Sequence, residues 1–353
     1  MEPRQYVPFD AFGMREEVRV SSLVRVGGQG WTCGQCPLDT NANVVAPGDL
    51  NAQAEFVCAM IHSVLARGGF ESRHVAQLTL YHAAPNARDL RQALSLFRQA
   101  FPHGPVILPV TVPYFYYEGM MLEIDVIADE TVQVSADQTA AGLQRIDGQD
   151  FAYVAAQAGS RADIENIIAS CGAAGETLLD ALWFAPVGTL AGTLARIPAG
   201  KPDRREFEAD QRANVVLTQG PKGGRDEHAA SLLFSKNSAV RTQVSQQGVV
   251  IRETASTVIL SAPSAQIGED LPTQAHSMMI ALAQALDSLG LSWAHVVKVS
   301  APYVGNASAD ALHENLRIRH SFHALPGPAS TGLPVTGFAA PQTRIFIQVI
   351  ARR

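Results

Sequence analysis

Apolar positions recur with helical spacing in two stretches of the chain that lie 221 residues apart, at 49–65 and 270–286. In each stretch they follow one another at intervals of three and four residues, which is the spacing of one buried helix face. The matching positions are Leu50, Ala54, Val57, Cys58, Ile61, Val64 and Leu65 in the first stretch, and Leu271, Ala275, Met278, Met279, Leu282, Ala285 and Leu286 in the second. Each stretch leads into a glycine, Gly69 or Gly290, and then into a strand-like run. This internal repeat indicates copies of one structural unit.

A weaker copy of the same pattern lies between these two. It predicts a shorter helix, preceded by a strand at 150–157 and followed by a strand at 178–184, with the helix stripe formed by Asp163, Ile164, Ile167, Ile168 and Cys171. Three copies give about 118 residues each, the size of a small domain. We therefore predict three domains, at 1–128, 129–235 and 236–353.

The first copy predicts the order ββαβαββ, an α+β fold with two helices on one sheet face. The expected helices cover 49–67 and 88–101. The expected strands cover 18–26, 31–35, 75–82, 106–113 and 120–128.

Composition narrows the possible partners. The chain is 47% hydrophobic and 17% charged, and its net charge of −6 argues against a nucleic-acid partner. No run of eighteen apolar residues predicts a membrane span, and the N-terminus lacks the pattern of a signal peptide. Four cysteines do not form a disulfide scaffold in a chain of this length. We expect a cytoplasmic protein.

The segment 198–228 is rich in turn-forming and charged residues. It carries a small basic cluster formed by Arg204, Arg205, Lys222 and Arg225. The cluster is typical of a solvated loop. The alternative is a flap that brings a cation to an anionic ligand.

Three groups of residues in the first copy resemble the YjgF/YER057c/UK114 family, also called the Rid family. They are Cys33–Asp39, then Gly48–Leu50 with Gln53, and finally Met121–Ala128. The family pattern is Ser-Gly-Gln-Ile-Pro-Leu-Asp, then a Gly-Asp-Ile helix start carrying Gln, and a closing Val-Glu-Ile-Glu-Ala-Ile-Ala. The third copy resembles the family over 258–351.

The resemblance implies a chorismate-mutase-like subunit, which in this family assembles as a trimer with ligand clefts between subunits. Three fused copies then predict a single-chain pseudo-trimer that is monomeric and binds a small-molecule substrate. No cofactor is expected, because no nucleotide-binding glycine motif occurs.

The resemblance also implies chemistry, since the family hydrolyses imines and enamines. Its carboxylate-binding arginine, in a Pro-Ala-Arg motif, falls at Gly104 in the first copy and at Ala329 in the third. Its closing-strand glutamate is Glu123 in the first copy but Phe346 in the third. The missing arginines suggest a substrate other than a simple 2-imino acid.

The remaining family positions give further candidates. The strand serine corresponds to Cys33 in the first copy and to Ser261 in the third, and the helix asparagine corresponds to Asn315. Cys33 and Cys36 have the Cys-x-x-Cys spacing, but no further ligands complete a zinc site, so no metal is expected. We take Cys33 as a catalytic candidate, with simple packing as the alternative.

Glu123 is the main catalytic candidate. Strand alternation places Glu123 and Asp125 on one face, where a half-buried carboxylate can act as a general base on water. The alternative is a solvent-facing residue or the partner of a buried arginine.

Two further residues are candidates for substrate binding because of the residues next to them in the sequence. Tyr116 belongs to the aromatic run 114–117, which predicts either interface packing or a stacking wall for an aromatic substrate. His103 precedes Gly104 and is either a polar contact at the cleft or a surface residue.

The sequence therefore predicts an enzyme, a cofactor-independent hydrolase or deaminase acting on an imine, enamine or related labile intermediate. One alternative is a catalytically inactive pseudo-trimer that binds a small molecule. Another is a chorismatase-like hydrolase, because those enzymes resemble fused Rid domains.

Overall fold

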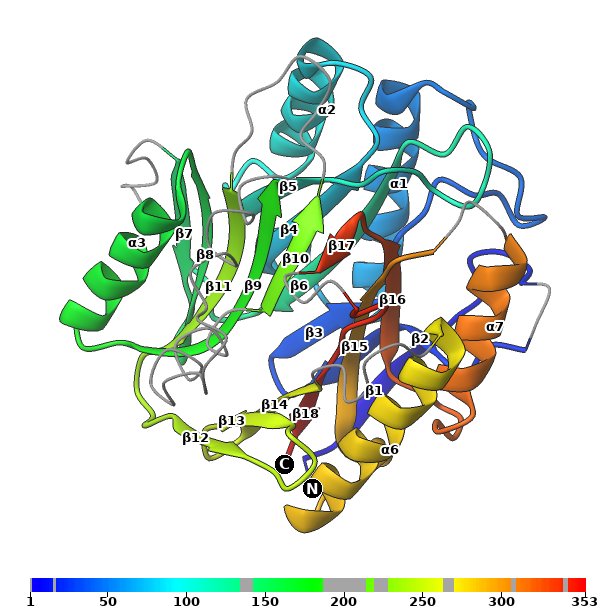
Figure 1. Ribbon diagram of the computed structural model, residues 1–353. Coiled ribbons are helices and arrows are strands. Elements are labelled where there is room, and N and C mark those ends of the chain that lie inside the picture. Colours follow the sequence, from blue (N-terminus) through cyan, green and yellow to red (C-terminus); the bar gives the residue numbers. More distant parts are fainter. Residues whose placement is uncertain are drawn as a thin grey trace.

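Three six-stranded sheets form the framework of the protein. The computed structural model describes residues 2–14, 17–133, 142–186, 214–218, 228–262, 270–305, 309–338 and 342–353. Within this part of the chain, the helices lie on the outside and the sheets face the middle of the molecule (Figure 1). No helix in these ranges is long and apolar enough to cross a bilayer.

The first sheet comes entirely from the N-terminal third of the chain. Its strand order is β1-β2-β3-β6-β4-β5, and helices α1 and α2 cover one face. The bounds are β1 (Arg4–Pro8), β2 (Ser21–Val26), β3 (Gln29–Thr32), α1 (Leu50–Arg67), β4 (Val75–His82), α2 (Ala87–Ala100), β5 (Val106–Thr111) and β6 (Leu122–Asp129).

The other two sheets repeat this plan with local differences. The second has the order β17-β10-β9-β11-β8-β7 and is covered by α3, and the third has the order β12-β13-β14-β18-β15-β16 and is covered by α6 and α7. The second contains β7 (Leu143–Asp147), β8 (Phe151–Ala158), α3 (Arg161–Ala173), β9 (Thr177–Pro186), β10 (Asn214–Thr218) and β11 (His228–Ser235). The third contains β12 (Arg241–Val244), β13 (Val250–Glu253), β14 (Thr257–Ala262), α6 (Leu271–Ser288), β15 (Val296–Tyr303), α7 (Ala309–His320), β16 (Ala329–Pro334) and β18 (Ile347–Arg352). Short 3₁₀ turns at Ser72–His74 and Trp293–His295 precede β4 and β15.

The helix and central-strand predictions agree closely with these elements, but several strands were not predicted, β1 and β17 among them. β1 extends the first sheet before the first predicted strand. β17 (Gly337–Phe338) pairs with β10, so a segment from the predicted third domain completes the second sheet. The second sheet is therefore built from segments on both sides of residue 235.

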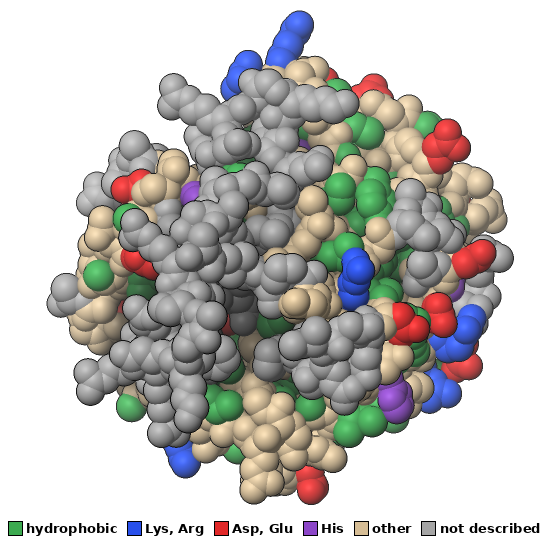
Figure 2. Space-filling model, in the orientation of Figure 1, with side chains coloured by type: hydrophobic (Ala, Val, Ile, Leu, Met, Phe, Trp, Pro, Cys, Tyr) green, Lys and Arg blue, Asp and Glu red, His purple; other side chains and the backbone are tan. Residues whose placement is uncertain are grey.

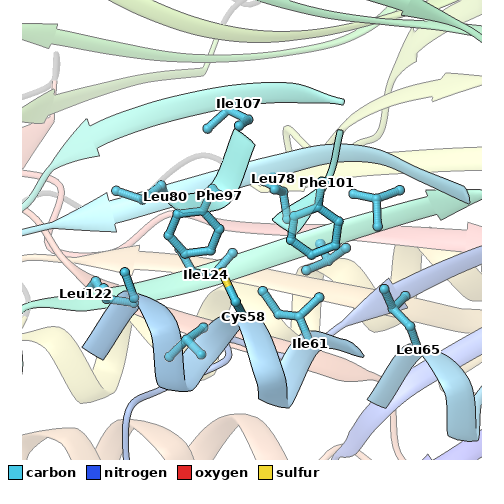
Figure 3. Close-up of a cluster of buried hydrophobic side chains, with 14 of the residues drawn as sticks. Cys58, Ile61, Leu65, Leu78, Leu80, Phe97, Phe101, Ile107, Leu122 and Ile124 are labelled. Carbon is cyan, nitrogen blue, oxygen red and sulfur yellow. The ribbon is translucent and has the colours of Figure 1, made fainter. Parts of the chain in front are cut away.

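Helix α1 shows why the repeated stripe is helical. Asp49 caps its N-terminus by accepting hydrogen bonds from the backbone amides of Asn51 and Ala52, both at 3.0 Å. Gly69 follows the helix with φ = +75°, a conformation that glycine adopts without steric cost. All seven apolar positions predicted for this stripe are buried. Figure 3 shows part of the stripe packed against α2 and the strands behind it.

A second kind of core fills the centre of the molecule. Side chains from the inner faces of all three sheets form one apolar cluster there. Leu108 comes from the first sheet, Tyr153 and Phe184 from the second, and Leu333 and Phe346 from the third. Each sheet is therefore buried on both faces, by its own helices outside and by the other sheets inside.

Three equivalent hydrogen-bonded pairs connect the sheets around this centre. The Asp125 carboxylate on β6 accepts from the Lys298 ammonium on β15, at 2.8 Å. The other two pairs join the third sheet to the second and the second sheet to the first: Gln348 Nε2 to Asp180 Oδ1 at 2.9 Å, and Gln77 Nε2 to Ser231 Oγ at 2.8 Å.

The strand registers show that these three pairs occupy corresponding positions. One member of each pair lies on a central strand, β4, β9 or β15, and pairs with a residue on the neighbouring antiparallel strand, β6, β11 or β18. These cross-strand partners are Gln77 with Ile127, Asp180 with Leu233, and Lys298 with Ile350. The other members, Asp125, Ser231 and Gln348, each lie two residues before those partners. Each sheet thus gives one side chain to the next sheet, in a head-to-tail order that closes into a ring.

The ionic pair is the most completely satisfied of the three. Lys298 Nζ also donates to the Thr32 carbonyl and to Thr331 Oγ1, both at 2.7 Å, so its three protons have three acceptors. Lys298 is 6% exposed and Asp125 9%. Charges buried to this degree are stable only when paired and hydrogen-bonded.

Replacing Lys298 tests the importance of this pair. Lys298→Met leaves the Asp125 carboxylate buried without a counter-charge, so we expect the free energy of unfolding to fall by about 3 kcal/mol. Gln77→Met, at the equivalent position, removes only neutral hydrogen bonds and should cost about 1 kcal/mol. Denaturant unfolding followed by circular dichroism measures both. Equal losses in the two variants would contradict a special role for the ionic pair.

Candidate functional site

A cavity of about 100 Å³ lies where the first sheet meets the third. Its lining includes Cys33 and Gly34, which directly follow β3, and Glu123 of β6. Across from them, Ser330 and Gly332 of β16 also line it. The rest of the wall is mostly apolar. It comes from helix α7, from the N-terminal residues 9–14 and 18–20, and from the segment 115–120.

Glu123 is the acidic residue in the cavity wall. It lies on β6 opposite Tyr81 of β4, and it is 9% exposed. Burial raises the pKa of its carboxyl group to about 8, and the nearby Asp125 charge acts in the same direction. The Lys298 charge and a hydrogen bond with Cys36 oppose this shift without cancelling it. At neutral pH the carboxyl group is therefore mostly protonated.

The backbone at Gly34 is shaped around this carboxyl group. A Cβ atom at residue 34 would overlap the Glu123 carboxylate. The Gly-Gln step after β3 therefore lets the chain approach the acid closely. Gln35 fixes that step by donating to the Cys33 carbonyl oxygen at 3.0 Å.

Cys33 also lines the cavity, but burial changes its chemistry. Its side chain is 3% exposed, and burial raises the pKa of the thiol to about 12. A nucleophilic cysteine requires a thiolate, which this environment disfavours. Cys33 and Cys36 are free thiols.

The aromatic run 114–117 both lines the cavity and packs between the sheets. Phe115, Tyr116 and Tyr117 line the cavity. Tyr116 also stacks on Tyr303 of β15, with ring centroids 5.7 Å apart and planes 5° apart, so it packs across the contact between the sheets.

Gln53 on α1 holds the end of the segment that carries this aromatic run. Its amide donates to the Gly119 carbonyl at 2.8 Å and accepts from the Met121 amide at 2.8 Å. In the third copy, Gln274 makes the corresponding contacts with residues 342 and 344. The glutamine shared by the two repeated helices therefore holds the backbone in place just before the last strand of each copy, β6 or β18.

Helix α7 contributes a buried arginine that the sequence analysis missed. Arg319 is 0% exposed, and its Nε donates to Asn315 Oδ1 at 2.9 Å while a terminal nitrogen donates to Ser330 Oγ at 3.0 Å. Asn315 is also 0% exposed and lies beside the cavity, one helical turn before Arg319. The signal in the sequence was the spacing of an asparagine and an arginine four residues apart on the face that carries Leu312 and Leu316.

The strand registers correct the predicted arginine positions. Ala329 pairs with Lys298, and the corresponding pair in the first copy is Val106 with Gln77. Gly104 and Ala329 are thus not equivalent positions. Aligning Pro-Ala-Arg on Pro328-Ala329 places the motif's arginine at Ser330, whose hydroxyl accepts from Arg319.

Two predicted site residues lie elsewhere. His103 Nε2 contacts the Val75 carbonyl at 2.8 Å, in a surface depression on the first sheet with Arg73, His74 and Glu130. Ser261 lies on β14 at the contact between the third and second sheets, where it accepts from Gln348 at 3.3 Å. Neither lines the cavity that contains Glu123. The basic cluster formed by Arg204, Arg205, Lys222 and Arg225 lies outside the described residues.

The two corresponding contacts between sheets carry no acid at this position. The registers match Glu123 with Phe346 in the third sheet and with Ala229 in the second. Within the described ranges, no three His, Cys, Asp or Glu side chains lie close enough to share a metal ion. The buried Glu123 carboxyl group can support acid–base chemistry in this cavity.

Comparisons with known proteins concern the family of the N-terminal third and the fold of the chain. The family model for endoribonuclease L-PSP matches residues 15–130. A chorismatase structure shares 9% identity over 79% of this chain and 93% of its own, with a TM-score of 0.52, which is a likeness of fold. No curated protein sequence matches the chain.

Single-domain structures match about a third of the chain. A YjgF/YER057c/UK114 family member from Mycobacterium tuberculosis shares 22% identity over 36% of this chain and 99% of its own, with a TM-score of 0.30. E. coli TdcF with bound serine shares 20% identity over 34% and 94%, with a TM-score of 0.30. From the family model and the motifs of the first copy, residues 15–130 belong to the endoribonuclease L-PSP family, known also as the YjgF/YER057c/UK114 or Rid family.

Proposed function

We propose that the protein is a hydrolase that converts an imine or enamine to a carbonyl compound and ammonia, without a cofactor, in the cavity between the first and third sheets. The observation that carries this proposal is the Glu123 carboxyl group, which is buried in the cavity wall with its pKa raised to about 8. A carboxyl group with a pKa near neutrality can both donate and accept a proton during turnover. Family membership of the first copy supports the choice of substrate class.

Glu123 alone can donate and accept every proton that moves in this reaction. Its carboxyl group protonates the imine nitrogen, or the β-carbon of an enamine, and leaves an electrophilic iminium carbon. The carboxylate then takes a proton from water as the water oxygen bonds to that carbon. Glu123 passes this proton to the amino nitrogen of the carbinolamine. The C–N bond breaks, ammonia leaves, and the hydroxyl proton returns to Glu123.

Cys33 has a supporting role in this proposal. As a buried thiol with a raised pKa, it lines the cavity without adding a charge. The covalent role that a cysteine can play elsewhere is not needed for the steps above.

Two alternatives remain open. The same cavity could bind a small molecule without turnover. The fold likeness to chorismatase also makes chorismate a reasonable compound to test. In both alternatives Glu123 would still face the ligand, so assays of turnover and of binding distinguish them.

We also propose that the protein is a single-chain pseudo-trimer located in the cytoplasm. The ring of pairs formed by Asp125, Gln348 and Ser231 with their partners supports the first part, because each sheet already has two neighbours within one chain. Four free thiols suit a reducing compartment.

Substitution of the acid should abolish turnover. With imines generated by an amino-acid oxidase, we expect Glu123→Gln to lower kcat/KM by about 100-fold or more, because the amide cannot carry the proton. Wild-type kcat/KM should fall as the pH rises through about 8, where the carboxyl group loses its proton. Glu118→Gln, on the exposed part of the aromatic segment, is the matched control. A Glu123→Gln variant as active as wild type would refute the proposed role.

The raised pKa also predicts how stability depends on pH. The ordinary pKa of this carboxyl group is 4.5, and in the folded protein it is about 8. Between these values the folded state holds a proton that the unfolded state has released, so stability is lost as the pH rises through this window. Relative to Glu123→Gln, wild type should lose about 1.4 kcal/mol per pH unit. Calorimetry from pH 4.5 to 8 measures this, and parallel curves for the two proteins would show that the pKa is not raised.

The pseudo-trimer proposal makes a simple prediction about assembly. Light scattering at micromolar concentration should give the mass of one chain, since the ring is already closed. A mass of three chains would instead mean that the sheets still pair between molecules.

A further inference from the structure

The N-terminal residues 9–14 lie over the cavity between the first and third sheets, and we call them the cover segment. Phe9, Phe12 and Met14 all line the cavity. The segment follows β1 along the chain and lies beside α7, which forms another part of the wall (Figure 1). It precedes residues 15–130, the part of the chain that matches the family model, so the match implies no role for it.

The wall of the cavity restricts access to the acid. Glu123 is 9% exposed and Cys33 is 3% exposed. A ligand that contacts either side chain must therefore displace part of the wall as it enters. The part of a structure that moves most readily is the one with the fewest buried contacts and the most exposed hydrogen bonds.

The other parts of the wall are held by regular structure or by buried side chains. Strand β16 pairs with β15 along its whole length. The segment 115–120 is held at its end by the buried Gln53 amide. Helix α7 packs into the core of the third sheet through Leu312 and Leu316. Moving any of these parts would break buried contacts.

The cover segment has weaker attachments. It belongs to no helix or strand, and each of its residues is at least partly exposed. The Gly13 amide donates to the Thr40 carbonyl at 3.1 Å. On its outer side, Arg67 at the end of α1 donates to both carboxylate oxygens of Asp10, at 2.7 and 2.8 Å. These two side chains are 42% and 57% exposed, so water and salt screen the ion pair.

Apolar contacts hold the inner side of the cover segment against the cavity. The Phe12 ring makes edge-to-face contacts with Phe9 and Tyr117, with ring centroids 5.2 and 6.5 Å apart. The surrounding outer surface is polar, and acidic and basic side chains lie side by side on it over α7 (Figure 2). Closure of the segment therefore buries aromatic rings and leaves the charged groups in water.

We propose that the cover segment opens and closes as the entrance to the cavity, with Pro8 as a hinge and the ion pair between Asp10 and Arg67 as a latch. Pro8 ends β1, and the register of β1 on β2 shifts between Val7 and Pro8, so regular sheet pairing stops where the segment begins. A cover of this kind admits a ligand and then limits the entry of water. The proposal goes beyond the reaction proposed above, because it holds whether the cavity hydrolyses its ligand or only binds it.

Two buried thiols can report the opening of the cover segment without any turnover. Cys33 lines the cavity, whereas Cys58 lies in the outer core between the first sheet and its helices. A buried thiol reacts with iodoacetamide only after it becomes exposed. The alkylation rate of Cys33 therefore measures opening of the cover, and that of Cys58 measures unfolding of the first sheet. Mass spectrometry of peptide fragments locates each label and separates Cys33 from Cys36.

Substitution of the latch should speed the opening. We expect Asp10→Asn to raise the alkylation rate of Cys33 about threefold at low salt, because the variant loses an exposed ion pair. The rate at Cys58 should stay unchanged. In about 1 M NaCl the wild-type rate at Cys33 should rise to that of the variant, because salt screens the pair.

Glu130→Gln is the matched control. It removes another partly exposed ion pair of the first sheet, with Arg25 at 2.8 Å, that does not involve the cover segment. This variant should alkylate Cys33 at the wild-type rate. The proposal is wrong if Asp10→Asn leaves the Cys33 rate unchanged or if Glu130→Gln raises it equally. An equal rise at Cys58 would also overturn it, because the sheet would then be unfolding.

Discussion

The ion pair between Asp125 and Lys298 is the constraint on which the arrangement of the site depends. It fixes β6 against β15, with the Thr32 carbonyl and the Thr331 hydroxyl as the remaining acceptors of Lys298. Glu123 lies two residues before Asp125 on the same face of β6, and Ser330 precedes Thr331. The contact that holds the two sheets together therefore also sets the distance between the acid and the wall that faces it. The Asp125 charge of this pair also contributes to the raised pKa of Glu123.

The three contacts between sheets have the same geometry but different chemistry. An ion pair occupies one, an amide–carboxylate pair the second and an amide–hydroxyl pair the third. Only in separate copies of a chain must all such contacts be identical. Here one contact keeps Glu123, while Phe346 and Ala229 occupy the matching positions in the others and pack into the central core. Repetition within one chain thus allows one contact to hold a site while the other two are packed with apolar side chains.

The sequence was sufficient for features set by local periodicity. The stripes of α1 and α6, and the strands β4 and β15, follow from apolar spacing and from a glycine at each helix end. Glu123, Cys33 and Tyr116 were found because motif and alternation place them in the first copy. Arg319 could not be found in this way, because its role comes from the packing of α7 against β16. The error at Gly104 arose because a loop of different length precedes β5, and only strand pairing reveals the correct register.

The position of β17 has a consequence for the order in which the chain can fold during synthesis. All strands of the first sheet precede residue 130, so this unit can form while the ribosome is still translating the rest. The second sheet pairs β10 with β17, at residues 337–338, and stays incomplete until almost the whole chain has emerged. The edge of β10, at Asn214–Thr218, therefore stays unpaired until Gly337–Phe338 have been made, and an unpaired edge is the part of a sheet most prone to associate with other chains. The middle third of the nascent protein is thus the part most exposed to aggregation.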